Sequence, residues 1–169
     1  MKIQHPKAAV VGPVSQGAED SLASQQRKIF DLYMAHFAQT LRWEQRQSRT
    51  SQGSQDQPQQ LNMNIDGKAG AGKSYLIRVL SARLEELAAQ NDLPNPIIRA
   101  APTGVAASKM DGSTLHSLLR IPTKGDYTSL TDANAAPVEA TFRNCRYLVI
   151  DEKSMVSLKL LNWVDQRLR

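Results

Sequence analysis

The chain contains a glycine-rich loop of the kind that binds phosphates. Residues 67–74 read Gly-Lys-Ala-Gly-Ala-Gly-Lys-Ser and fit the pattern G-x-x-x-x-G-K-[ST]. Glycines allow positive φ angles and let successive backbone N–H groups approach anionic oxygens. Lys73 can reach the β- and γ-phosphates of a nucleoside triphosphate, and the Ser74 hydroxyl can bind Mg²⁺. The loop therefore predicts a magnesium–nucleotide site, and its remaining positions are Gly67, Lys68, Ala69, Gly70, Ala71 and Gly72.

An acidic pair follows an apolar stretch farther along the chain. Residues 147–150 read Tyr-Leu-Val-Ile, typical of a strand buried on both faces, and Asp151 and Glu152 come next. In a triphosphate hydrolase, Asp151 would hold Mg²⁺ directly or through water, and Glu152 would orient and deprotonate the attacking water. The alternative is an acidic pair that caps a helix beginning near Ser154. Beside a phosphate loop, the catalytic interpretation is favoured, with Lys73 as the third catalytic residue.

The phosphate loop has the pattern of a strand before it and of a helix after it. Residues 61–66 alternate apolar and polar side chains, as a short half-buried strand does. After Ser74, apolar residues recur at helical spacing, so the amino end of a helix would point at the phosphates. The alternative is a glycine-rich turn with no ligand. The helical stripe consists of Leu76, Ile77, Leu80, Leu84 and Leu87.

Two further segments complete the pattern of an α/β fold. Residues 97–101 are a short buried-strand candidate that runs into a loop and helix at 102–107, and residues 112–119 predict another turn and helix. Strands that alternate with helices imply a parallel sheet covered on both faces. Ligands bind at the carboxyl ends of such strands, where the phosphate loop, Thr103 and Asp151 would fall.

The 169 residues suggest one domain of ordinary globular composition, with 41% hydrophobic and 22% charged residues. We predict a flexible leader over residues 1–20 and an ATP-binding lobe over 21–169, which begins with a helix from Ser21. Residues 44–60 are a polar, glutamine-rich linker or loop within that lobe, and 122–137 a surface excursion. The leucines of residues 158–168 predict an amphipathic helix.

Composition also limits the class of protein. No run of about 18 apolar residues occurs, so no membrane span is expected. The single cysteine, Cys145, excludes an internal disulfide framework and a multi-cysteine zinc site, and its apolar neighbours predict a core or near-core thiol. A formal net charge of +5 is compatible with a nucleic-acid partner.

The order of motifs resembles one family, the Pif-type DNA helicases, which are superfamily-one motors that move five-prime to three-prime on single-stranded DNA. The resemblance spans roughly residues 22–168 and implies a P-loop NTPase with a RecA-like parallel sheet. Five stretches carry it: residues 22–30, 66–77, 101–107, 112–118 and 148–156.

The resemblance also implies roles for single residues. Gln26 would hydrogen-bond the adenine edge, so the nucleotide implied is ATP. The metal implied is Mg²⁺. Thr103 and Gly104 would touch the backbone of single-stranded DNA, and Thr114 and His116 would lie on the same DNA side. The family implies roles in DNA repair, recombination and telomere maintenance. It also implies an intracellular location, nuclear or mitochondrial in a eukaryote and cytoplasmic in a bacterium.

The chain departs from the family pattern in three places. Lys153 replaces an aliphatic residue and, by strand alternation, would share a face with Asp151, where its ammonium could disturb Mg²⁺. Ala71 replaces threonine at a position where the backbone amide does the phosphate work. The later motifs, the second motor lobe and its arginines are missing, so the chain resembles the first half of a motor.

These departures leave three hypotheses. The first is the nucleotide-binding lobe of an ATP-dependent DNA helicase, a fragment unable to unwind DNA alone. The second is a nucleotide-gated binding module that hydrolyses little ATP. The third is an inactive, truncated product.

Overall fold

The computed structural model describes residues 14–15, 17–48 and 57–169. Most of the predicted leader and the middle of the predicted 44–60 linker lie outside these residues. The chain divides into two compact units, an N-terminal unit of Val14–Leu87 and a C-terminal unit of Ala88–Arg169, and each is described by itself. The assignment of residues 21–169 to one lobe stays a prediction.

The N-terminal unit is helical over its described residues. A short 3₁₀ helix, η1 (Ala18–Ser21), precedes α1 (Ser24–Gln47), and α2 (Lys73–Gln90) follows the phosphate loop. The helix predicted from Ser21 therefore begins at Ser24, because η1 occupies the preceding turn. Ala18 is buried, so the last residues of the predicted leader belong to a folded element.

The strand predicted over residues 61–66 is wrong. Leu61, Met63 and Ile65 are half-buried and the residues between them are exposed, so the predicted alternation of side chains is present. No ladder forms there, and residues 57–68 contain neither helix nor strand. An extended segment needs a partner strand to satisfy its N–H and C=O groups, and sequence periodicity does not report whether one is available.

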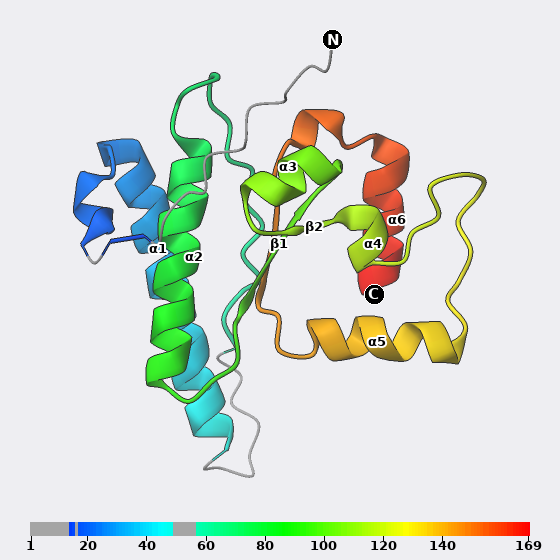
Figure 1. Cartoon of the computed structure of the whole chain (residues 1–169). Helices are drawn as coiled ribbons and strands as arrows, with labels where there is room; N and C mark the ends of the chain where they lie inside the picture. Colours follow the sequence, from blue (N-terminus) through cyan, green and yellow to red (C-terminus); the bar gives the residue numbers. More distant parts are fainter. Residues whose placement is uncertain (1–13, 16, 49–56) are drawn as a thin grey trace. The chain divides into compact units, whose positions relative to one another are not determined.

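The C-terminal unit contains a three-stranded parallel sheet with flanking helices, so the predicted α/β class is confirmed (Figure 1). The strand order is β2-β1-β3. Because β3 lies at an edge of this sheet, three of its four residues are half-buried, where burial on both faces was predicted. The elements are β1 (Ile97–Ala101), α3 (Gly104–Lys109), β2 (Ser113–Thr114), α4 (Leu115–Leu118), α5 (Asp132–Phe142), β3 (Tyr147–Ile150), η2 (Lys153–Met155) and α6 (Leu158–Leu168).

The register of the sheet brings the carboxyl ends of its strands together. Ala100 of β1 lies opposite Ile150 of β3 and opposite Ser113 of β2. The backbone N–H of Asp151 donates to the carbonyl oxygen of Ala100 at 3.0 Å, which carries the ladder one residue past β3. The segments that follow all three strands therefore begin at the same end of the sheet, the carboxyl end of its strands.

A hydrophobic cluster supports this edge from within the C-terminal unit. Leu115 and Leu119 are fully buried, and Leu160 and Val164 come from the inner face of α6. The other members of the cluster are Ala100, Ile121 and Val138.

The predicted surface excursion of residues 122–137 lies at the surface, but its second half is helical where no helix was predicted. Helix α5 begins at Asp132 and includes Pro137. Proline removes one backbone hydrogen bond from a helix interior, but alanine has the highest helix propensity, and four of the eleven residues of α5 are alanine. Val138 of this helix is buried.

Cys145 is half-buried, and its Sγ donates to the carbonyl oxygen of Tyr147 at 3.3 Å. Burial raises the pKa of this thiol. A raised pKa lowers the fraction of nucleophilic thiolate at neutral pH, so Cys145 has the environment of a structural thiol. Among the described residues, none of the helices has the length and apolar character needed to cross a membrane.

We predict that Leu119→Ala lowers the free energy of unfolding by about 2–5 kcal/mol, because it deletes buried methyl groups from the cluster and leaves a cavity. Urea denaturation followed by circular dichroism measures this change. Leu161→Ala is the matched control, since Leu161 of α6 is 49% exposed and its removal should change stability by about 0.5 kcal/mol or less. Equal effects of the two substitutions would contradict this account of the core.

Candidate functional site

The phosphate loop of the N-terminal unit is a turn with two glycines in left-handed conformations. Gly70 has φ 79° and Gly72 has φ 76°, values that side chains with a Cβ rarely adopt. The N–H of Ala71 donates to the carbonyl oxygen of Lys68 at 3.1 Å and closes the turn. Residues 67–71 are exposed, and α2 begins directly after the loop, at Lys73.

The two side chains predicted to meet the phosphates lie in the first turn of α2. The Lys73 ammonium folds back over the loop and donates to the carbonyl oxygens of Gly67 at 2.7 Å and Lys68 at 3.2 Å. Ser74 is exposed in the same turn. An ammonium group over the loop and a hydroxyl group at a helix amino end favour an anionic ligand there.

Gln26 lies against the phosphate loop, although it precedes Gly67 by 41 positions in the sequence. Its Nε2 donates to the carbonyl oxygens of Ala71 at 3.1 Å and Gly72 at 3.3 Å. Its Oε1 accepts from the backbone N–H of Ala23 at 2.8 Å. The structure therefore brings together two motifs that the sequence analysis connected only through a family resemblance.

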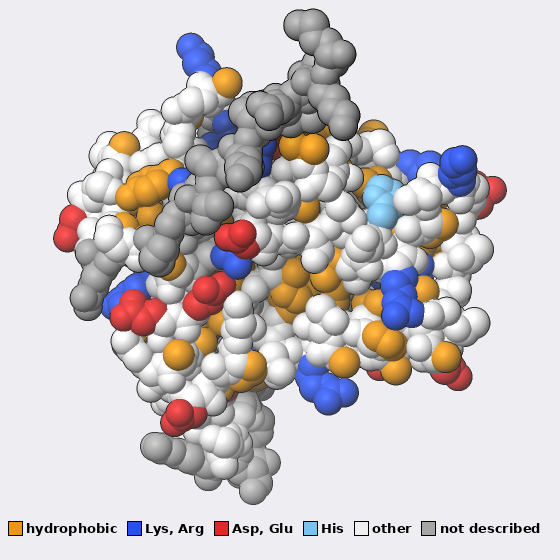
Figure 2. Space-filling view, viewed as in Figure 1, with side chains coloured by type: hydrophobic (Ala, Val, Ile, Leu, Met, Phe, Trp, Pro, Cys, Tyr) orange, Lys and Arg blue, Asp and Glu red, His pale blue; other side chains and the backbone are white. Residues whose placement is uncertain are grey.

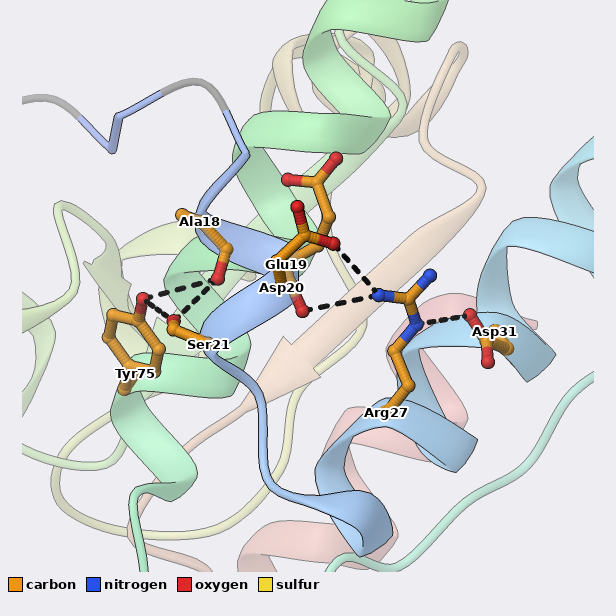
Figure 3. A network of polar contacts seen from close by, with 7 residues as sticks. All are labelled: Ala18, Glu19, Asp20, Ser21, Arg27, Asp31 and Tyr75. Atoms are coloured by element: carbon orange, nitrogen blue, oxygen red, sulfur yellow. Dashed lines mark hydrogen bonds and ion pairs between the residues drawn. The ribbon is translucent and has the colours of Figure 1, made fainter.

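Tyr75 ties the start of α2 to the segment that precedes α1 (Figure 3). Its hydroxyl group lies 2.6 Å from Ser21 Oγ and 3.4 Å from the carbonyl oxygen of Ala18. Ser21 Oγ in turn donates to the Ala18 carbonyl at 2.6 Å. These bonds join η1, which precedes Gln26, to the first turn of α2, which follows the loop. They therefore help to hold Gln26 beside the loop.

Arg27 orders the other side of the same segment (Figure 3). Its Nε donates to Asp31 at 2.9 Å, and its Nη1 lies 3.5 Å from Asp20 and 3.3 Å from the carbonyl oxygen of Glu19. The hydrogen bond with Asp31 is the main cause of a raised pKa for Arg27. This network was not predicted from the sequence, because its members meet only once η1 turns back toward α1.

In the C-terminal unit, the residues predicted to touch DNA lie at the carboxyl ends of β1 and β2, with Thr114 as the last residue of β2. Thr103 is the N-cap of α3, with its Oγ1 accepting from the N–H of Ala106 at 3.2 Å, and Gly104 is the first, exposed residue of that helix. Thr114 caps α4 in the same way, and His116 lies in that helix.

The acidic pair follows β3 at the same edge. Asp151 Oδ1 accepts from the backbone N–H of Glu152 at 2.8 Å. Glu152 is exposed and adopts a left-handed conformation with φ 53°. Lys153 then begins η2, so the alternation that placed its side chain on the face of Asp151 does not apply. The chain has already left the strand at Ile150.

A pocket of about 370 Å³ in the C-terminal unit joins two of the predicted DNA residues, Thr103 and His116. Its lining also includes Lys124, Lys159 and Trp163, which the sequence analysis missed. The available signal was the spacing of Lys159 and Trp163, four residues apart in a predicted helix, which places them on one face.

A glycine-rich loop that opens a helix, and a parallel α/β sheet with an acidic pair after one strand, define the P-loop class of nucleotide-binding folds. Comparison with known proteins identifies the family. The family model for PIF1-like helicases matches residues 40–169, and the chain belongs to that family.

Similar proteins agree with this assignment. The chain is 27% identical over 173 aligned positions to ATP-dependent DNA helicase PIF7 of Trypanosoma brucei brucei, covering 97% of this chain and 14% of that protein. It is 33% identical to ATP-dependent DNA helicase Pif1 of a Psychrobacter species, covering 64% of this chain and 16% of that protein. The structure of unliganded Pif1 from a Bacteroides species matches 88% of this chain and 27% of that one, at 26% identity and a TM-score of 0.58. The chain thus spans about one-sixth of the length of these two helicases.

We predict that Gly72→Ala destabilises the N-terminal unit for two separable reasons. A Cβ at Gly72 meets the positive φ of that residue and overlaps Nε2 at the flexible end of Gln26, so Gln26 must turn away and lose its hydrogen bonds to the loop. Backbone strain of this kind costs about 1–3 kcal/mol. The overlap should disappear in the double variant Gly72→Ala/Gln26→Ala.

The measurement is a double-mutant cycle by urea denaturation, in which the double variant should be more stable than the sum of the single effects. Gly70→Ala is the control, since a Cβ there meets nothing within 4 Å and only the strain remains. Additive effects of the Gly72 and Gln26 substitutions would show that Gln26 does not pack on the loop.

Proposed function

We propose that this chain is the nucleotide-binding lobe of an ATP-dependent DNA helicase, which binds and hydrolyses Mg-ATP and contacts single-stranded DNA. Its membership of the PIF1-like helicase family supports the proposal. The observation that supports it most is the contact between Gln26 and the phosphate loop, because the residue predicted to bind the adenine then touches the loop predicted to bind the phosphates.

The phosphate loop fits a triphosphate. Its left-handed glycines remove Cβ atoms from the loop surface, and the exposed turn leads into the amino end of an 18-residue helix. Lys73 donates to carbonyl oxygens of the loop. Phosphate oxygens carry negative charge, so they would compete for the same ammonium protons and form stronger hydrogen bonds. The Gln26 amide could likewise exchange its loop contacts for the adenine edge.

The metal and water chemistry is assigned to three side chains. Mg²⁺ would neutralise developing charge on the phosphates. Ser74 offers a hydroxyl ligand from the first turn of α2, and Asp151 offers a carboxylate at the edge of the sheet. Glu152 would orient the attacking water and accept its proton. Glu152 is exposed and lies two residues after the end of β3.

DNA contact is assigned to the carboxyl edge of the C-terminal unit. Thr103, Gly104, Thr114 and His116 lie at the starts of two short helices that follow neighbouring strands. Backbone N–H groups and hydroxyls at such positions suit phosphate oxygens, which fix a strand without reading its sequence. The proposed partner is therefore the sugar–phosphate backbone of single-stranded DNA.

We predict that saturating Mg-ATP raises the unfolding midpoint of the chain by several degrees, because a ligand at 100 times its dissociation constant stabilises a binder by about 2.7 kcal/mol. Lys73→Ala should abolish the shift, since it removes the ammonium group that faces the phosphates. Thermal unfolding with and without Mg-ATP is the measurement. Lys28→Ala, an equal charge change on the exposed surface of α1, should keep the shift. An unchanged shift in Lys73→Ala would refute the nucleotide site.

We predict that the chain binds oligo-dT with an affinity that falls as salt rises, by about 0.7 log units per log unit of salt for each neutralised phosphate. His116→Ala and Thr103→Ala should weaken binding, measured by fluorescence anisotropy. Thr103→Asp separates DNA contact from folding, because its carboxylate keeps an acceptor for the helix cap but repels phosphate oxygens. Binding that is absent, or insensitive to salt, would remove the DNA assignment and leave the nucleotide assignment standing.

A further inference from the structure

The pocket shared by Thr103 and His116 has a second wall that the proposed DNA residues do not explain. This wall comes from α6 and from the segment just after Ile121, and it includes Lys124, Lys159 and Trp163. With a volume of about 370 Å³ and a wide opening to solvent, the pocket is a surface hollow with room for part of one nucleotide. Met155, which is 58% exposed, adds an apolar side chain to the lining.

Trp163 gives this wall a flat, half-buried aromatic surface. Lys159 Nζ lies 4.7 Å from the centre of the Trp163 ring, and the Tyr127 ring centre lies 6.2 Å away, with the two rings inclined at 40°. Bases of single strands stack on such rings whatever their sequence, because every base has a π-face. The Trp163 ring is therefore suited to one base of a strand, and on the face now covered by Lys159 that base would displace the ammonium group.

The cations beside Trp163 are available to a phosphate. Lys159 is paired with Asp126 at 3.5 Å, but the Asp126 side chain is 98% exposed and that of Lys159 is 60% exposed. Ion pairs with this exposure contribute little, so a phosphate could replace Asp126 at small cost. Lys124 is exposed at the same pocket. Figure 2 shows basic side chains beside apolar patches in the region where Figure 1 draws α4 and α6.

The wall is held in place from behind. The Arg167 guanidinium lies 4.7 Å from the centre of the Tyr127 ring, and its Nη2 donates to the carbonyl oxygen of Thr128 at 3.1 Å. Ser157 caps the start of α6 by accepting from the N–H of Leu160 at 3.1 Å. The segment that carries Lys124 and Tyr127 is therefore fastened to the helix that carries Trp163.

We propose that Trp163, Lys159 and Lys124 extend the DNA site, so that one nucleotide stacks its base on Trp163 and places its phosphate against the two lysines. This inference rests on the proposed function, because Thr103 and His116 supply the strand that passes the pocket. The occupant is a nucleotide of single-stranded DNA, since the wall combines an aromatic face with positive charge.

The first experiment uses the intrinsic fluorescence of Trp163. The chain has two tryptophans, so Trp43→Phe leaves Trp163 as the single reporter. Titration of this variant with oligo-dT should quench and shift the emission of Trp163 in step with binding measured by anisotropy. Binding without any change in the emission would overturn the inference.

The second experiment compares variants by anisotropy at several salt concentrations. Trp163→Ala should weaken binding by about fivefold or more, and Trp163→Phe should restore most of it, because a ring remains to stack on. Lys159→Ala should reduce the salt slope by about 0.7, because one phosphate fewer is then neutralised. Arg143→Ala is the matched control for charge, since Arg143 is exposed at the end of α5, just before the opposite end of β3.

The outcomes separate the two proposals. One outcome is that Thr103→Ala and His116→Ala weaken binding while the Trp163 and Lys159 variants bind as the unmodified chain does. The extension is then wrong, and the DNA site proposed at Thr103 and His116 stands. If the unmodified chain binds no oligo-dT, the DNA edge fails and the extension fails with it. Equal losses in Lys159→Ala and Arg143→Ala would also overturn the extension, because they would reflect net charge alone.

Discussion

The parallel pairing of β1 with β3 is the constraint on which the C-terminal unit depends. Four register pairs join the two strands, and the N–H of Asp151 adds one more bond to Ala100 beyond them. Because both strands run in the same direction, the loops that carry Thr103 and Asp151 both begin at the carboxyl end of the sheet. A shift of one residue would turn every side chain of β3 to the other face of the sheet. The positions of Thr103 and Asp151 thus follow from backbone hydrogen bonds that involve neither side chain.

In the N-terminal unit, the equivalent constraint is supplied by side chains. This unit has no sheet among its described residues, and Gln26 at the phosphate loop and Tyr75 at Ser21 add polar ties to the buried apolar side chains of α1 and α2. These bonds are exposed or half-buried, so each is worth about 1 kcal/mol. A site organised in this way can exchange its internal bonds for bonds to a ligand.

The sequence allowed prediction of those parts that local patterns determine. The bounds of β1, β3 and α6 follow from apolar runs and helical spacing, and they agree with the structure. Residues 61–66 show the limit of this reasoning, because side-chain alternation cannot supply a partner strand. The helix that begins at Asp132 was not predicted, because Pro137 is unfavourable in a helix interior and its effect is outweighed by the neighbouring alanines. The wall formed by Lys124 and Trp163 depends on tertiary packing, which no local pattern encodes.

Glu152 carries a further consequence of its backbone conformation. Its φ of 53° lies in a region that a glycine adopts without strain, whereas for a residue with a Cβ it costs about 1–2 kcal/mol. Asp92, Asp111 and Arg120 adopt the same conformation, with φ between 49° and 53°. Glycine at any of these four positions would relieve backbone strain, but only at Glu152 would it also remove a carboxylate of the acidic pair. A screen that rewards thermal resistance alone would therefore favour the loss of that carboxylate.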